Sequence, residues 1–125
     1  MKAGFSFLEM LITVIIILAL LLTGLMALKD IIEKSRSAEA RYVLGQLRNA
    51  QMARGMFTGE CALSVAELDV IAPDKCVPSH YFRYYLAQDG QKGVAERCTR
   101  AGKPPQSKTP YKISLDFRSG VFSLK

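Results

Sequence analysis

A long uncharged apolar run near the start of the chain limits its possible folds more than any other feature. Residues Met10 to Leu28 form 19 consecutive positions without a charge. At about 1.5 Å rise per residue, a helix of that length spans roughly 28 Å, close to the hydrocarbon thickness of a bilayer. The run therefore predicts a membrane-spanning helix within residues 5–28.

The run differs from a cleavable secretory signal peptide. Such peptides have a shorter apolar core and a small-residue cleavage site after it. Here the sequence after Leu28 continues as "KDIIEKSRSAEARYV", with no Ala-x-Ala-like site. Lys2 lies before the span, which favours a cytoplasmic N-terminus by the positive-inside rule. Lys29, Lys34 and Arg36 follow the span, so the charges alone leave the orientation open.

The helix is expected to continue beyond the apolar run, over residues 29–57. This stretch contains no proline and is rich in good helix formers. Apolar residues recur at steps of three and four, which places them on one face. The chain would thus form one helix with an apolar half and an amphipathic half. The predicted stripe consists of Ala40, Val43, Leu44, Leu47, Ala50 and Phe57.

A connecting loop is expected at residues 58–79, followed by a sheet at residues 80–125. Gly59, Pro73 and Pro78 interrupt the loop. The segments "HYFRYYLAQ", "VAERCTRA", "YKISLDF" and "VFSLK" are typical of strands, and the short turns between them favour an antiparallel meander. We therefore predict an α+β fold, with the amphipathic half of the helix packed on three to four strands and residues 29–125 forming a globular head.

Three cysteines, Cys61, Cys76 and Cys98, all lie beyond the apolar run. This distribution fits an oxidising compartment, with one disulfide and one thiol left over, although three reduced thiols remain an alternative. We favour a Cys61–Cys76 bond because both residues flank one turn-rich loop. A Cys76–Cys98 bond is the main alternative. The spacing does not predict a metal site.

Charge is unevenly distributed over the second half of the chain. Residues 77–125 contain nine lysines and arginines against three acids, whereas residues 58–76 contain one lysine and four acids. A basic sheet and an acidic loop can meet between neighbouring copies of the chain. A solvated basic surface is an equally favoured interpretation.

Nucleic-acid binding is a third and less favoured interpretation of the basic region. Arginines and lysines can contact phosphates, and Tyr81, Phe82, Tyr84 and Tyr85 lie nearby for base stacking. Aromatic residues in a strand, however, more often belong to a core. The candidate phosphate-binding residues are Arg83, Arg97, Arg100, Lys103 and Lys108.

No combination of residues predicts catalysis. His80 is the single histidine and has no evident nucleophile partner, and the sequence contains no phosphate-binding loop. We therefore expect neither enzyme activity nor a cofactor.

The segment "KAGFSFLEMLITVIIILA" resembles the N-terminus of type IV pilins and the related pseudopilins. The family motif is a short basic leader that ends in Gly, then Phe, then Glu at the fifth mature position, then an apolar run. Lys2 matches the leader charge, Gly4 the residue before the cleavage site, Phe5 the new N-terminus and Glu9 the acidic residue. The detailed match covers roughly residues 2–30.

The resemblance implies removal of the leader, residues 1–4, by a membrane-embedded prepilin peptidase, and N-methylation of Phe5. It implies a single-pass protein of the inner membrane with its C-terminal domain outside the cytoplasm. The chain would then polymerise with copies of itself into an extracellular pilus, through an assembly platform in the inner membrane. A pseudopilin of a type II secretion system, in a periplasmic pseudopilus, is the first alternative. A membrane-anchored pilin for DNA uptake or adhesion is the second.

For all of these functions the position of Glu9 needs a physical explanation, because a charge within a membrane segment is costly and usually has a partner. After cleavage the α-amine of Phe5 would be a cation about one helical turn away. In a bundle of such helices, Glu9 of one subunit can pair with the Phe5 amine of another and so fix the axial register. The simpler alternative is that Glu9 is exposed to water at the membrane surface.

Overall fold

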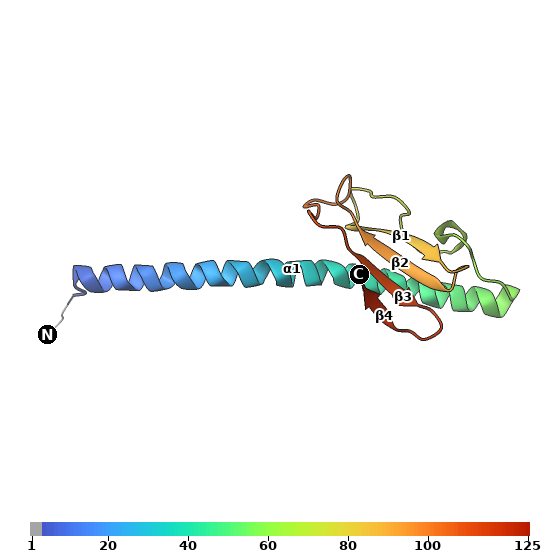
Figure 1. The fold of residues 1–125 in the computed structure, drawn as a ribbon, viewed down its shortest axis with the longest axis horizontal. Helices are drawn as coiled ribbons and strands as arrows, with labels where there is room; N and C mark the ends of the chain where they lie inside the picture. Colours follow the sequence, from blue (N-terminus) through green and yellow to red (C-terminus); the bar gives the residue numbers. More distant parts are fainter. Residues whose placement is uncertain (1–3) are drawn as a thin grey trace. The chain divides into compact units, whose positions relative to one another are not determined.

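The computed structural model describes residues 4–125 and contains one long helix, one short 3-10 helix and four strands (Figure 1). The α+β prediction is confirmed, and the helix ends within one residue of its predicted end. In chain order, the elements are α1 (Phe7–Thr58), η1 (Val65–Glu67), β1 (Phe82–Ala87), β2 (Lys92–Arg97), β3 (Lys112–Asp116) and β4 (Phe122–Leu124).

The chain divides into two compact units, Met1–Ser35 and Arg36–Lys125. The division falls within α1. The first unit therefore contains the apolar run, and the second contains the remaining part of α1 together with the loops and the sheet.

Two threonines within the apolar run satisfy their hydroxyl groups on their own helix. Thr13 Oγ1 donates to the carbonyl oxygen of Glu9 at 2.7 Å. Thr23 Oγ1 donates to the carbonyl oxygens of Ala19 at 3.2 Å and Leu20 at 3.0 Å. Side-chain bonds of this kind let a hydroxyl group enter an apolar environment without leaving a donor unpaired.

The second unit contains a four-stranded antiparallel sheet in the order β1-β2-β3-β4, the meander expected from the sequence. Tyr84 pairs with Ala95, and Ser114 pairs with Ser123. The turn between β1 and β2 contains Gly90, which has a φ of 82°. A Cβ atom at Gly90 would collide with the carbonyl oxygen of Ala62, so this position requires glycine for both conformation and space.

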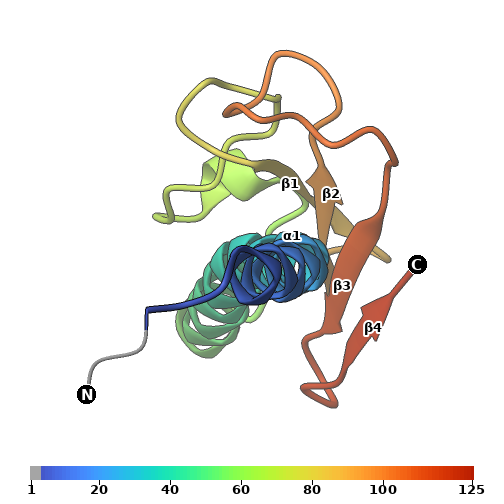
Figure 2. The same ribbon diagram turned by 90° about the vertical axis from the view of Figure 1, so that its left-hand side faces the viewer.

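The core lies between α1 and one face of the sheet, with the loop before β1 closing another side (Figure 2). Burial raises the pKa of Tyr84 well above its ordinary value, and the nearby carboxylate of Glu39 adds to this effect. The predicted stripe is largely confirmed. Its buried members are Ala40, Val43, Leu44 and Leu47, which pack with Phe82, Tyr84, Ala95, Ile113, Leu115 and Phe117 of the sheet region.

The stripe prediction was wrong at its far end. Phe57 is 90% exposed, whereas Gln51, which the pattern omitted, is buried. Gln51 Nε2 donates to the carbonyl oxygens of Ala62 at 2.8 Å and Gly90 at 2.7 Å, and its Oε1 accepts from Ala62 N at 2.9 Å. The sheet stops short of Phe57, and the amide of Gln51 instead joins the helix to the loop and to the β1–β2 turn.

The favoured disulfide was also wrong, because the bond joins Cys76 to Cys98 and leaves Cys61 free and exposed. The fold explains this pairing. Cys98 follows β2, and its backbone N–H donates to the carbonyl oxygen of Tyr81 at 2.9 Å, which holds it beside the chain leading into β1. Cys61 instead precedes Ala62, whose backbone is hydrogen-bonded to Gln51 of α1. Gln51 also donates to Gly90, in the turn between β1 and β2, so Cys61 is held at the end of this hairpin opposite to Cys98.

Candidate functional site: the N-terminal end of the apolar helix

The residues at the start of α1 form a capping box. Ser6 N donates to Glu9 Oε2 at 3.2 Å, and Glu9 N donates to Ser6 Oγ at 3.2 Å. These reciprocal bonds satisfy two backbone donors that would otherwise have no partner at a helix N-terminus. The negative charge of a Glu9 carboxylate also suits this end of the helix dipole. The arrangement fixes Glu9 in the first turn of α1.

This capping box was not among the features predicted from the sequence. The signal was present, since Ser6 and Glu9 have the spacing of a serine followed three residues later by a glutamate. The structure therefore gives Glu9 a local partner that does not depend on a second chain.

The bond between Gly4 and Phe5, the expected cleavage site, lies outside the helix. Gly4, Phe5 and Ser6 all precede α1 and are exposed. An exposed, non-helical peptide bond is accessible to a peptidase without unwinding of α1. The other expected leader residues, including Lys2, lie outside the residues that the structure describes.

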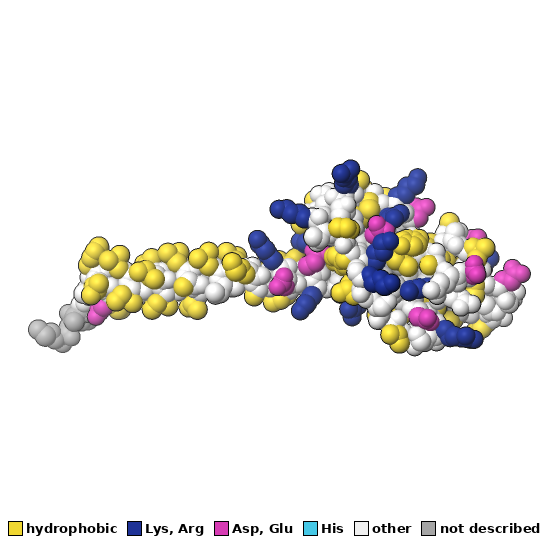
Figure 3. Space-filling model, in the orientation of Figure 1, with side chains coloured by type: hydrophobic (Ala, Val, Ile, Leu, Met, Phe, Trp, Pro, Cys, Tyr) yellow, Lys and Arg dark blue, Asp and Glu magenta, His cyan; other side chains and the backbone are white. Residues whose placement is uncertain are grey.

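Apolar side chains surround the first half of α1 and are exposed along its length (Figure 3). They include Phe7, Ile15, Leu21 and Met26. The helix is long and apolar enough to cross a membrane, as judged by its length and composition. Exposed apolar surface of this extent requires lipid or other protein chains to cover it.

Comparison with known proteins identifies no relative of this chain. No protein-family model, curated protein or solved structure matches the chain. The interpretation of the N-terminal site therefore depends on its own residues.

The predicted basic surface is not a single site. Arg97 is only 2% exposed, so its inclusion as a surface residue was wrong. Its guanidinium donates to the carbonyl oxygens of Tyr81 at 3.1 Å and Pro105 at 3.0 Å. Arg97 thus holds the loop after β2 against the start of β1, because a guanidinium can bind several carbonyl oxygens in fixed geometry.

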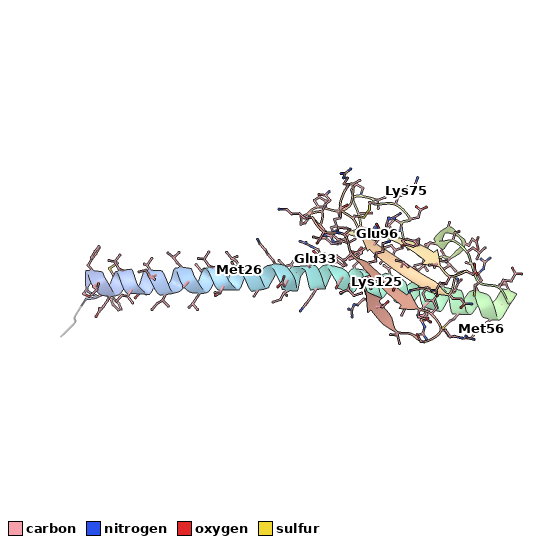
Figure 4. All side chains as sticks on the ribbon, viewed as in Figure 1. Met26, Glu33, Met56, Lys75, Glu96 and Lys125 are labelled. Atoms are coloured by element: carbon pink, nitrogen blue, oxygen red, sulfur yellow. A yellow bond between two sulfur atoms is a disulfide. The ribbon has the colours of Figure 1, made fainter. Side chains whose placement is uncertain are left out.

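The other candidate basic residues are accessible but dispersed along the chain. Arg83 donates to Glu96 Oε2 at 2.7 Å, and Lys112 Nζ lies 3.8 Å from the same oxygen. Glu96 is labelled on the sheet in Figure 4. Arg100, Lys103 and Lys108 are exposed in the segment between β2 and β3. Phe82 and Tyr84, two of the aromatic residues considered for base stacking, are fully buried. The structure thus removes Arg97, Phe82 and Tyr84 from the nucleic-acid hypothesis.

Within residues 4–125, no group of three or more histidine, cysteine, aspartate or glutamate side chains is placed to hold a metal ion. The features that remain as a candidate site are the exposed Gly4–Phe5 bond, the capped Glu9 and the uncovered apolar surface that follows them.

Proposed function

We propose that the chain is a pilin-like subunit, processed between Gly4 and Phe5 and polymerised through the first half of α1 into a helical filament. A membrane would hold the chain before assembly, and the second unit would lie outside the cytoplasm. In the filament, contacts with neighbouring helices replace contacts with lipid. Repeated heterologous contacts that do not close on themselves produce an open fibre.

The observation that carries the proposal is the order of features at the N-terminus. An exposed Gly–Phe bond precedes the helix, an acidic residue occupies the first helical turn, and the apolar side chains that follow are exposed. A membrane anchor would explain the apolar surface but not the spacing of Gly4, Phe5 and Glu9. A processed subunit explains both.

The competing function is a single-span membrane anchor that never polymerises. The capping box favours this alternative, because it gives Glu9 a structural role within its own chain. Mass spectrometry of the mature chain separates the two functions. A pilin-like subunit begins with N-methylated Phe5, whereas an unprocessed anchor keeps the residues before Phe5.

A substitution at Glu9 separates the helix-capping role from the charge role. A capping box accepts either glutamate or glutamine at this position. Glu9→Gln therefore keeps the cap but removes the charge. We predict that Glu9→Gln is cleaved normally but enters filaments at least roughly tenfold less than the parent chain, because the charged partner for the Phe5 amine is lost. The amount of chain in sheared surface filaments measures this effect.

The control is Ser6→Ala, which removes the hydroxyl that accepts the Glu9 N–H while keeping the carboxylate. Loss of this cap costs about 1 kcal/mol of helix stability, and we expect filament entry close to that of the parent chain. Normal assembly of Glu9→Gln would contradict the proposed register role of Glu9.

A surface pilus and a secretion pseudopilus both use a subunit of this kind. We propose the pilus as the first of the two functions. Recovery of the chain in filaments sheared from the cell surface supports a pilus, and its retention in the periplasm supports a type II secretion pseudopilus. A specialised role in DNA uptake or adhesion has no specific support from the described surface.

A further inference from the structure

One edge of the sheet carries exposed apolar side chains with basic residues around them. Among the strands of residues 4–125, β4 is the last in the sheet order and pairs only with β3. Val121, just before the strand, and Phe122 and Leu124, within it, are exposed, with Leu124 at 67%, and we call these three residues the β4 patch.

Cations from two parts of the second unit surround the β4 patch. The Arg41 guanidinium, from α1, lies 5.5 Å from the centre of the Phe122 ring. Arg118 and Lys125 flank the strand and are exposed. Asp116 also lies beside β4, but its Oδ1 accepts from Arg118 N at 2.9 Å and from Ser119 N at 3.0 Å and so serves the β3–β4 turn.

A second surface combines exposed apolar side chains with the opposite charge. Residues 58–76, which we call the acidic segment, contain four acids and one lysine. Leu63 is 67% exposed and Ile71 is 82% exposed. Glu67 lies 3.4 Å from Arg54 and is therefore engaged within its own chain. The other acids of the segment, Glu60, Asp69 and Asp74, are exposed.

The later part of the acidic segment lies beside β1, because Tyr84 N donates to the carbonyl oxygen of Pro73 at 2.8 Å, whereas β4 forms the other edge of the sheet. The start of the segment lies closer to the β3–β4 turn, since Cys61 and Arg118 line one pocket. Figure 2 shows the yellow-green segment on one side of the helix and β4 on the other. One copy can therefore use both surfaces at the same time. A contact between two different surfaces is heterologous, and it extends from copy to copy.

We propose that the acidic segment of one copy binds the β4 patch of a second copy of this chain. Charge complementarity identifies the occupant, since each surface has exposed apolar side chains and an excess of one charge, which is acidic on the segment and basic around the β4 patch. Burial of Ile71 and Leu124 removes apolar surface from water, and the surrounding opposite charges set the orientation. The inference rests on the proposed function, because polymerisation through α1 brings the second units close together.

Cysteine cross-linking in whole cells tests the contact directly. The full chain carries Cys61→Ser, which removes the free thiol, together with Ile71→Cys and Val121→Cys. Mild oxidation is expected to give a ladder of dimers and higher multimers. Each single cysteine variant is expected to give no ladder, because a heterologous contact needs both positions. Ile71→Cys with Lys108→Cys, an exposed residue away from the β4 patch, is the matched control and is also expected to give no ladder.

Charge reversal tests the electrostatic part of the contact. In the cross-linking background, Arg118→Glu with Lys125→Glu is expected to lower the yield of the ladder at least roughly tenfold, because like charges then face each other. Asp69→Lys with Asp74→Lys is expected to have the same effect. All four changes together should restore the ladder. Arg100→Glu with Lys108→Glu makes an equal change of charge elsewhere and should leave the yield unchanged.

The N-terminus of the cross-linked sample is determined by mass spectrometry in the same experiment. A processed N-terminus without a ladder overturns the contact between the acidic segment and the β4 patch but leaves the proposed function standing. An unprocessed N-terminus overturns the proposed function, whether or not a ladder forms. A ladder that also forms with the Lys108→Cys control, or that the charge reversals leave unchanged, overturns the proposed contact.

Discussion

The side-chain amide of Gln51 joins three segments of the second unit. It exchanges two hydrogen bonds with the backbone of Ala62 and donates a third to Gly90. Polar groups inside a protein are costly when unpaired, so this side chain stabilises the fold only as long as all three bonds are made.

We predict that Gln51→Met lowers the free energy of unfolding by about 2–3 kcal/mol, because it leaves the backbone groups of Ala62 and Gly90 without their buried partner. Unfolding of the full chain in detergent micelles, followed by the near-ultraviolet circular dichroism of the tyrosines, measures the change. Gln46→Met is the control, since Gln46 bonds only to the exposed Tyr42 hydroxyl in the described contacts. A Gln51→Met variant as stable as this control would contradict the role of the amide.

Asp116 makes the stability of the β3–β4 turn depend on pH. Backbone hydrogen bonds from Ser119 and Arg118 hold the pKa of the Asp116 carboxyl below its ordinary value. A group with a depressed pKa in the folded state contributes stability above its unfolded pKa, and that contribution is lost as the pH falls through the folded pKa. We therefore expect Asp116 to stabilise the fold above about pH 4 and to stop doing so in stronger acid.

The test compares acid unfolding of the parent chain with that of Asp116→Asn. The variant should be less stable at neutral pH, and the difference should shrink as the pH falls below about 4. Asp69→Asn also removes one exposed carboxylate, and it serves as the control. A difference between parent and Asp116→Asn that stays constant with pH would contradict this role.

Single-residue environments were the part of the fold least accessible from the sequence. Periodicity placed Ala40, Val43, Leu44 and Leu47 in the core, because a helical stripe depends on nearby positions only. Periodicity failed for Phe57, and the prediction of a basic surface from the charge distribution failed for Arg97. The exposure of Phe57 depends on where the sheet ends, and the burial of Arg97 depends on carbonyl groups from two other segments.

At the scale of elements, the helix, the loop and the meander were predictable because each has a local signal. The strands show alternation or aromatic enrichment, and the turns contain glycine or other turn residues. The choice between the two candidate disulfides was not predictable, since the observed bond, which was the alternative, joins a loop to the end of β2. Only the pairing of β1 with β2 brings Cys98 beside the chain that leads into the sheet.

The Cys76–Cys98 bond is expected to stabilise the loop before β1. It closes a sequence separation of 22 residues. The chain-entropy estimate for a loop of this size gives about 3 kcal/mol. We predict that Cys76→Ser with Cys98→Ser lowers the free energy of unfolding by about that amount, whereas Cys61→Ser leaves it nearly unchanged. Peptide mapping under non-reducing conditions checks the connectivity, and a bridge that contains Cys61 would contradict it.

At the scale of the whole molecule, the two units pose different physical problems. The second unit buries an apolar core between α1 and its sheet. The first unit leaves its apolar surface uncovered, and that surface must contact lipid or other chains. This contrast, together with the Gly4, Phe5 and Glu9 spacing, is the physical basis for proposing a subunit that moves from a membrane into a filament.

The most direct test of that proposal is the N-terminal mass of the chain recovered from filaments sheared from the cell surface. The proposal predicts that the chain is present in those filaments and begins with N-methylated Phe5. Absence of the chain from the filaments, together with a membrane-bound form that still carries residues before Phe5, would contradict it.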